Sequence, residues 1–246
     1  MSQKYLKYFL ILNLVLLVTA IWRSDMLPPA TDLSPILLNE PVQTQVTQAA
    51  FLTKSNDINY SIQPLYEYDL VGLVVSKHDA NTWWDSIHRE WNDHLNIVDL
   101  CVVWGNNVRN GVYQEINFSS GQFTCNFSTN SNEVFAAFDQ SAISNNHLLT
   151  DQPSIAKRIR SVRVGDQIHF RGHLVEYSHN QGFPFKRGTS IVRTDTGNGA
   201  CETVFIDSFD IIKGGGRPWR ILVWVASALL LLGLIVWFLR PVRFND

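Results

Sequence analysis

The sequence predicts a mainly β domain with short helices, held between two transmembrane helices. Three observations lead to this prediction. Two long apolar segments stand near the two ends of the 246-residue chain. Segments rich in β-branched and aromatic residues, separated by Gly, Asn and Ser turns, fill the region between them. That region is acidic, whereas the chain next to the apolar segments is basic, which gives the molecule a direction across a membrane.

The C-terminal apolar segment, residues 221–239, contains no charged side chain. As a helix with a rise of 1.5 Å per residue it is about 28 Å long, close to the roughly 30 Å hydrocarbon core of a bilayer. Trp224 and Trp237 stand near its two ends, where aromatic rings prefer the headgroup level. We therefore predict a transmembrane helix over 217–240 and a cytoplasmic tail at 241–246.

The N-terminal apolar segment, residues 8–22, has Asn13 as its main polar interruption. Two interpretations are open. A retained anchor over 1–23 is favoured because Arg23 closes the apolar run as a residue at the membrane edge does. A cleavable signal peptide is the alternative, since the small residues at 18–20 resemble a cleavage site.

Charge predicts the orientation. Residues 24–216 hold 13 basic and 21 acidic side chains, a net charge of −8. The two tails carry basic residues, which favour the cytoplasmic side: Lys4, Lys7, Arg240 and Arg243. Arg217 and Arg220 oppose this orientation, but long loops translocate largely regardless of charge. We expect a cell-membrane protein, in the inner membrane if the organism is a Gram-negative bacterium, with its main domain periplasmic or otherwise extracytoplasmic.

The same charge argues against nucleic acid as a partner. A basic cluster lies at residues 157–163, and such clusters can steer phosphates. Phosphate binding needs a positive surface, however, and this domain is strongly negative. We expect instead the lipid bilayer and other envelope or membrane proteins as partners.

Composition divides the region between the apolar segments. Residues 24–64 hold five prolines and little periodicity, which predicts a flexible connector. Residues 65–213 form the predicted domain, and three glycines at 214–216 follow as a hinge.

Within that domain we predict strands at the following ranges: 65–76, 97–104, 112–118, 122–127, 167–177, 189–196 and 201–212. Helical stretches are expected at 82–94 and within 153–160. Strands, then a helix, then the Gly165–Asp166 turn into another strand resembles the element order of an OB-fold. This resemblance implies a small OB-fold-like β-barrel, and it names an architecture without a function.

Three cysteines lie in predicted strands: Cys101, Cys125 and Cys201. An oxidising compartment favours one disulfide and one remaining thiol. We favour a Cys101–Cys125 disulfide because neighbouring antiparallel strands can bring two Cβ atoms close enough, and a bridge to Cys201 is the rival. A nucleophilic Cys101 beside Asp99 would need a histidine that the sequence does not place.

Trp84, His88 and Trp91 follow helical spacing. This stripe predicts either helix packing on the domain or a stacking platform for a sugar or an aromatic ligand. His88 and His94 fall on opposite sides of such a helix, which argues against a zinc pair.

His169, Arg171 and His173 share one face of the predicted strand 167–177. This face is either an ordinary polar surface or a patch for anions and carboxylates. Basic residues later in the chain would join such a patch: Lys186, Arg187 and Arg193. The two histidines are about 13 Å apart on an extended strand, too far to share a metal ion. We expect neither a metal nor a cofactor.

No catalytic motif stands out, so an enzymatic activity is open and not favoured. We expect an interaction or assembly component of an envelope complex. The alternatives are a membrane-anchored hydrolase acting on glycan or peptide, and a ligand-sensing domain that relays binding through the spans.

Overall fold

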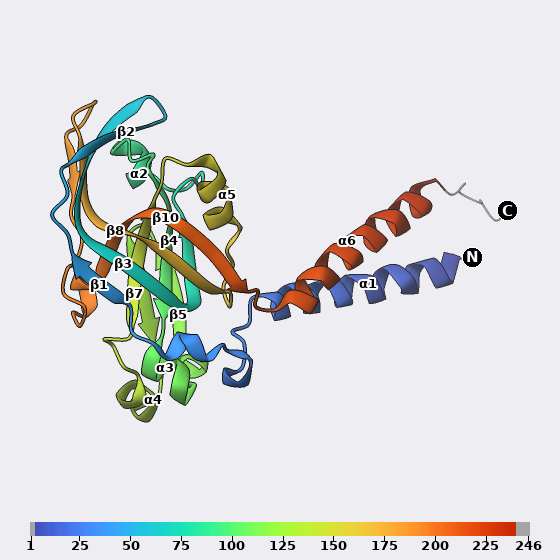
Figure 1. The fold of residues 1–246 in the computed structure, drawn as a ribbon. Coiled ribbons are helices and arrows are strands. Elements are labelled where there is room, and N and C mark those ends of the chain that lie inside the picture. The colour runs from blue at the N-terminus through green and yellow to red at the C-terminus, as the bar shows by residue number, and fades with distance from the viewer. Residues whose placement is uncertain (1–2, 240–246) are drawn as a thin grey trace. The chain divides into compact units, whose positions relative to one another are not determined.

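The structure, a computed structural model, describes residues 3–239 (Figure 1). It divides into two units, one formed by residues 1–26 and 215–246 and the other by residues 27–214. The predicted tail at 241–246 lies outside the described residues.

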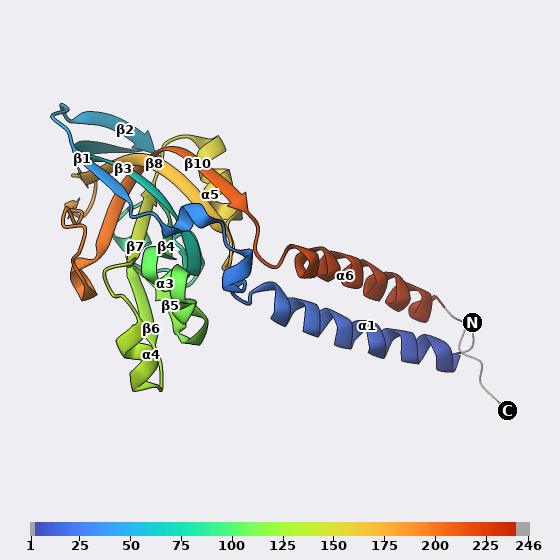
Figure 2. The ribbon, with the colours of Figure 1, turned by 60° about the horizontal axis from the view of Figure 1, so that its bottom comes forward.

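Two helices, α1 (Gln3–Ser24) and α6 (Arg217–Phe238), make up the first unit and run side by side in opposite directions (Figure 2). Both are long and apolar enough to cross a membrane, which confirms two apolar terminal helices. Small side chains allow close packing: Ala226 and Gly233, seven residues apart on α6, are buried. A Cβ at Gly233 would lie 2.7 Å from Cδ2 of Leu10. Cleavage or retention of α1 stays a prediction.

The second unit is mainly β with short helices, as predicted. Its larger sheet contains eight strands: β1 (Val42–Gln45), β2 (Phe51–Ser55), β3 (Ile58–Asp79), β4 (Asn96–Val103), β7 (Ile143–Leu149), β8 (Gln167–His179), β9 (Phe185–Arg187) and β10 (Cys201–Lys213). A separate hairpin contains β5 (Asn117–Gly121) and β6 (Thr124–Ser128). The short helices are α2 (Ile87–Glu90), α3 (Gly105–Asn110), α4 (Asn132–Ala137) and α5 (Pro153–Ser161).

Five of these strands are paired in a cyclic order: β3, β4, β7, β10, β8 and back to β3. The β7–β10 pair is parallel and the other four pairs are antiparallel. Strands β1 and β2 add to β3, and β9 adds to β8. Gly172 permits a close approach of β8 and β10, because a Cβ at this position would lie 2.1 Å from the carbonyl oxygen of Phe205.

Side chains alternate across β4 and β7, but every residue of both strands is buried. On one side, Val98, Leu100 and Leu148 belong to the main hydrophobic core. The other side carries Asp99 and His147 and is covered by further chain. The hairpin β5–β6 contacts β3, β4 and β7 there.

Several secondary-structure elements differ from those predicted from the sequence. Residues 24–64, predicted to be a flexible connector, contain β1, β2 and the start of β3, all paired in the sheet. The alternation that buries Tyr60 and Ile62 extends β3 towards the N-terminus, and Pro64 is tolerated where the β3–β8 register shifts. The predicted helix 82–94 is helical only in α2, and Asn92 beyond its end adopts a positive φ of 51°.

Three segments also differ from the strand predictions. Residues 112–115 of the predicted strand 112–118 form a 3₁₀ helix, and β5 begins only at Asn117. Residues 189–196 contain no strand, although their composition favours one. Strand β7 was not expected, because Ser144, Asn145, Asn146 and His147 make it polar. Asn146 donates to Ser144 in the same strand and to the Leu100 carbonyl of β4, and His147 bonds to Asp99. Such bonds permit a polar segment to be a buried central strand.

Candidate functional site

The polar side of β4, β7 and β10 forms the candidate site, which we call the site face. Strand pairing aligns its residues in rows. Asp99 on β4 lies opposite His147 on β7, and His147 lies beside Thr203 on β10. The neighbouring row is formed in the same way by Cys101, Asn145 and Cys201.

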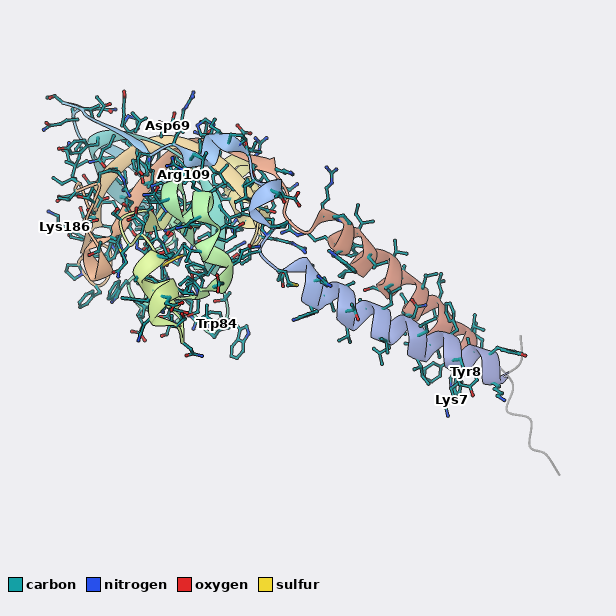
Figure 3. The ribbon with its side chains drawn as sticks, turned by 90° about the horizontal axis from the view of Figure 1, so that it is seen from below. Lys7, Tyr8, Asp69, Trp84, Arg109 and Lys186 are labelled. Atoms are coloured by element: carbon teal, nitrogen blue, oxygen red, sulfur yellow. A yellow bond between two sulfur atoms is a disulfide. The ribbon has the colours of Figure 1, made fainter. Side chains whose placement is uncertain are left out.

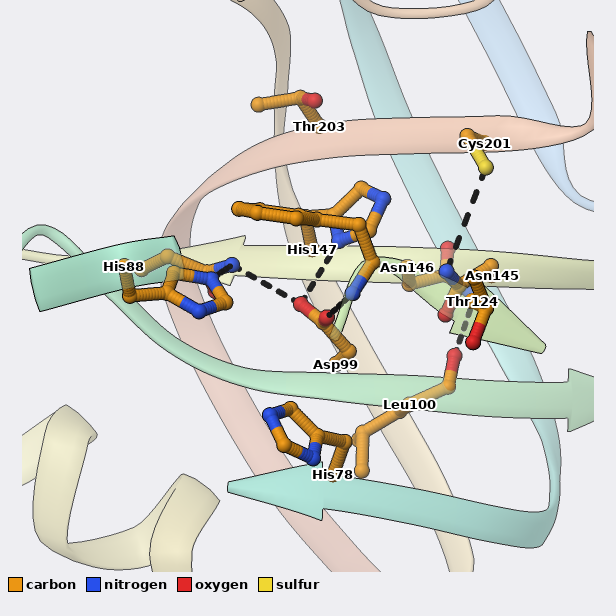
Figure 4. Close-up of polar contacts among 12 residues, drawn as sticks. His78, His88, Asp99, Leu100, Thr124, Asn145, Asn146, His147, Cys201 and Thr203 are labelled. Carbon is orange, nitrogen blue, oxygen red and sulfur yellow. Dashed lines mark hydrogen bonds and ion pairs between the residues drawn. The ribbon is translucent and has the colours of Figure 1, made fainter. Parts of the chain in front are cut away.

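Asp99 and His147 are joined at the centre of the site face (Figure 4). Nδ1 of His147 lies 2.6 Å from Oδ1 of Asp99, and both side chains are completely buried. On its other side the imidazole meets Arg187 of β9, whose Nη2 lies 2.7 Å from Nε2 of His147. A guanidinium has only hydrogens to give, so Nε2 accepts and Nδ1 donates to Asp99. His147 is therefore a neutral imidazole between a carboxylate and a cation.

Asp99 accepts two further hydrogen bonds. Nδ2 of Asn96 lies 2.9 Å from Oδ1, and the backbone nitrogen of Phe123, at the turn of the β5–β6 hairpin, lies 3.0 Å from Oδ2. The second contact ties the hairpin turn to β4. Three donors thus surround one buried carboxylate, which is the arrangement that a buried anion requires.

These contacts determine the charges at neutral pH. Burial by itself would raise the pKa of Asp99, but the interactions with His147 and Asn96 outweigh it and hold the pKa at about 2. Burial lowers the pKa of His147, against the opposing effect of Asp99. The carboxyl group is therefore ionised and the imidazole neutral, in agreement with the hydrogen bonds.

The network continues from Asn96 into a second buried group. Asn96 Nδ2 also lies 2.9 Å from Nε2 of His88. Oδ2 of Asp85 then lies 2.6 Å from Nδ1 of His88 and 2.7 Å from Nε2 of His78. The ligand atoms of these last three residues all lie within 4.8 Å of one another, close enough to consider a metal ion.

The hydrogen bonds argue against a metal ion in this arrangement. The Asn96 amide donates to Nε2 of His88, so the His88 proton must be on Nδ1, where it points at Asp85. Nδ1 is the atom that would have to bind the ion, and metal binding needs it deprotonated. Oδ2 of Asp85 thus already bonds to both histidines, through Nε2 of His78 and the protonated Nδ1 of His88.

A cavity of about 620 Å³ opens beside this network, between β6, β7 and the segment that leads into β10. Its walls include Phe123, Phe127, Asn145, Arg187 and Cys201. The Arg187 guanidinium carbon lies 3.8 Å from the centre of the Phe123 ring. No ion pair joins Arg187 to a carboxylate among residues 3–239. This cation therefore stands at a cavity wall, held by a neutral histidine and an aromatic ring.

Asn145 is a further polar residue at the cavity wall, and it is 2% exposed. Its Oδ1 has no hydrogen-bond partner in the described part of the chain. Its Nδ2 has a contact of only 4.0 Å with Sγ of Cys201. A buried amide with an unpaired oxygen costs about 1–3 kcal/mol, so a donor from a ligand would be favourable here.

The cysteines are arranged as predicted. Cys101 and Cys125 form a disulfide with a Cα–Cα distance of 5.6 Å, which links β4 to the β5–β6 hairpin. The hypothesis of a nucleophilic Cys101 is therefore wrong. Cys201 is a free thiol, and burial raises its pKa, so it carries little thiolate at neutral pH.

The predicted tryptophan and histidine stripe is not a helical face, because α2 contains only four residues. The three side chains instead surround the polar network. His88 and Trp91 pack against Phe123, with ring centres 4.1 and 5.6 Å away. Trp84 lies at the surface (Figure 3), and its ring and that of His78 meet in an edge-to-face contact.

The second predicted patch lies on β8, beside a cavity of about 380 Å³. His169, Arg171 and His173 share one face, as predicted, but each has a carboxylate partner. Asp69 pairs with His169 and with Arg171 at 2.7 Å, and Asp207 lies 3.1 Å from His173. We call this group the β8 face.

Arg193 does not join the β8 face. It lies 3.0 Å from the buried carboxylate of Glu202, and its guanidinium stands over the Trp104 ring at 4.6 Å. Burial raises the pKa of Glu202 to about 7, although Arg193 acts in the opposite direction. Arg193 therefore has a structural partner of its own.

Sequence reasoning missed the residues that build the site face, above all Asn96, Asn145 and His147. One signal was present: the polar run Ser144–His147 is bounded by Ile143 and Leu148. A run of polar residues flanked by apolar residues indicates buried polar groups with hydrogen-bond partners.

No protein-family model, no curated protein and no solved structure matches the chain.

Proposed function

We propose that this chain is a membrane-anchored binding protein whose β domain takes up an anionic small molecule at Arg187, in the extracytoplasmic compartment. One observation carries the proposal: Arg187 stands at the wall of a cavity of about 620 Å³ without a carboxylate partner among the described residues. Arginine binds carboxylates and phosphates through two parallel hydrogen bonds. A cavity of this size is in the range of small-molecule sites.

Preorganisation supports binding at this position. His147 receives one N–H of the guanidinium and is itself held by Asp99. Phe123 supports the guanidinium plane from one side. An arginine that is already oriented loses less conformational entropy when a ligand arrives. Asp99 and His147 act in this proposal as positioning residues, and the anion contacts Arg187.

The strand pairing supports an OB-fold-like barrel as the architecture. The cyclic order of five strands contains one parallel pair, β7–β10, and α5 lies between β7 and β8 in the chain. OB-folds bind ligands on their second and third strands and on the loops between strands one and two and between strands four and five. The corresponding elements here are β4, β7 and the segments 80–95 and 180–200. All of them contribute to the site face.

The location rests on two features, the two apolar helices and the disulfide. Disulfides persist in oxidising compartments. A reporter active only outside the cytoplasm, inserted into the exposed turn at Asn56 and Asp57, should be active in whole cells. The same reporter fused after Asp246 should be inactive. An inactive insertion at the turn, in a chain that still folds, would place the domain in the cytoplasm and contradict the location.

The chemistry favours binding over hydrolysis. Both ring nitrogens of His147 are engaged, Cys101 is in a disulfide, and burial raises the pKa of the Cys201 thiol. A hydrolase needs a free base beside an activated nucleophile. Ligand sensing through the two helices fits the proposed site, and assembly within an envelope complex stays a prediction.

The binding proposal predicts a charge-dependent stabilisation. Full-length protein in detergent micelles is heated with a panel of small carboxylates and phosphates, each matched with its neutral amide or alcohol. At least one anion should raise the melting temperature, its neutral counterpart should not, and Arg187→Gln should abolish the effect.

Lys186→Gln is the matched control, because Lys186 neighbours Arg187 on β9 and is paired with Glu176 at 2.8 Å. It removes the same charge from the same strand and should retain the stabilisation. Equal shifts in Arg187→Gln and in the unmodified protein would contradict the proposed function.

A further inference from the structure

We infer that the ligand of the Arg187 cavity is a monocarboxylate with an N–H or O–H donor next to its acid group and an apolar remainder. This inference rests on the proposed function and specifies its ligand class. Three properties of the cavity wall support it: its single charge, its unpaired acceptor and its aromatic surface.

The first property is the charge balance. Arg187 is the one charged side chain among the described residues that line the cavity. The Cys201 thiol beside it is neutral, because burial raises its pKa. One guanidinium matches one carboxylate. A phosphate monoester carries close to two negative charges at neutral pH, and the second would stay uncompensated in a region whose net charge is −8.

The second property is the unpaired acceptor. Asn145 lines the cavity, and its buried Oδ1 has no hydrogen-bond partner in the part of the chain that the structure describes. A carboxylate oxygen cannot satisfy it, because two acceptors repel. Arg187 and Asn145 line the same cavity, so one ligand can meet both if a donor stands close to its carboxylate. N-acyl amino acids, the C-terminal residue of a peptide and hydroxy acids have this arrangement.

The third property is the apolar part of the wall. The cavity is lined by Phe123, Phe127 and Ile143, together with the disulfide-bonded Cys125. Burial of an apolar group there gains about 25 cal/mol for each Å² removed from water. A small acid with an aromatic or branched side chain would bury this apolar surface, whereas acetate or lactate would leave it exposed to water.

The test uses isothermal titration calorimetry on the full chain in detergent micelles with four probes. N-acetyl-L-phenylalanine has all three features. Its amide lacks the charge, 3-phenylpropionate lacks the donor, and phenyl phosphate replaces the carboxylate by a phosphate. We expect the first to bind tightest. Loss of the charge should weaken binding about 10-fold to 100-fold and loss of the donor about 3-fold to 10-fold.

Two variants assign these effects to residues. Arg187→Gln should remove the preference for N-acetyl-L-phenylalanine over its amide, and Lys186→Gln should keep it. Asn145→Leu should reduce the preference over 3-phenylpropionate to near 1, while binding of 3-phenylpropionate itself stays within a factor of about 3. Asn145→Ala serves the same purpose if the leucine variant does not fold, as judged by its thermal melt.

The outcomes separate the two proposals. Tighter, Arg187-dependent binding of phenyl phosphate would overturn the carboxylate assignment and leave the proposed function intact. An unchanged preference over 3-phenylpropionate in the Asn145 variants would overturn the donor assignment alone. If Arg187→Gln changes the affinity of none of the four probes, the inference and the proposed function both fail.

Discussion

The site face and the β8 face are built from the same kinds of residue, yet they differ in what they offer a ligand. Each combines an arginine, histidine and aspartate beside a cavity. On the β8 face, Arg171 and His169 share the carboxylate of Asp69. On the site face the Asp99 carboxylate pairs with His147 and not with an arginine, and Arg187 contacts the far side of that histidine.

This difference decides which cation is available. A guanidinium paired with a carboxylate must give up that partner before it binds another anion, so its net attraction is small. A guanidinium held by a neutral imidazole keeps its full charge for a ligand. The identity of the group beside an arginine is therefore more informative than the presence of the arginine.

Burial separates the two faces as well. The Asp99 side chain is completely buried, whereas that of Asp69 is 35% exposed. Interactions of the buried carboxylate are stronger because little water screens them. The predictions below test this contrast in order of expected effect.

Asp99→Asn should destabilise the protein most. The amide offers one oxygen where the carboxylate offers two, and its NH₂ group would face donors from His147, Asn96 or Phe123. We expect a loss of about 3–5 kcal/mol in the free energy of unfolding. Urea unfolding of the full chain in detergent, followed by tryptophan fluorescence, measures it. A loss below about 1 kcal/mol would mean that the network contributes little to stability.

Acid should weaken the site face by a smaller amount. The pKa of Asp99 is about 2 in the folded protein, below its ordinary value of 3.8. Ionised Asp99 therefore stabilises the fold above about pH 4, and this contribution, on the order of 2 kcal/mol, is lost as pH falls towards 2. His147 acts in the same direction, because burial lowers its pKa below 6.5 and protonation then favours unfolding.

Urea unfolding at several pH values between 7 and 2.5 measures this decline. In Asp99→Asn the part of the decline below pH 4 should shrink, because the titrating carboxyl group is gone. A decline of equal size in both proteins would assign the acid sensitivity to other carboxylates.

Asp69→Asn should have the smallest effect, which makes it the matched control for Asp99→Asn. Both substitutions remove one carboxylate beside a histidine, but Asp69 is partly exposed to water. Exposed pairs contribute about 0–1 kcal/mol, so we expect a loss of no more than about 1 kcal/mol in the same urea experiment. Equal losses in the two variants would remove burial as the distinction between the faces.

Much of the fold was predictable because its signals are local. The apolar length at 221–239 predicts a spanning helix without any knowledge of neighbours, and β-branched runs predict β3 and β4. The Cys101–Cys125 disulfide was also predicted correctly, from strand positions. The connector prediction for 24–64 missed β1 and β2, because edge strands depend on the strand they pair with more than on their own composition.

The site was predictable only in part. Trp84, His88 and Trp91 do lie around the polar network, although the helix that suggested them is short. The residues that define the site face come from β4, β7 and β10, and Arg187 beside them comes from β9; these strands are far apart in the chain. Their spacing contains no periodic signal, since register between strands is a property of the folded sheet.

The sequence by itself determined the class of molecule: two apolar helices, a β-rich acidic domain between them and one disulfide. These depend on hydrophobicity, propensity and charge, which act within a segment. Only the tertiary structure decided which charged groups neutralise one another. Asp69 meets Arg171 and Asp99 meets His147 because strand pairing brings them together, and that pairing leaves Arg187 with its charge free at the cavity wall.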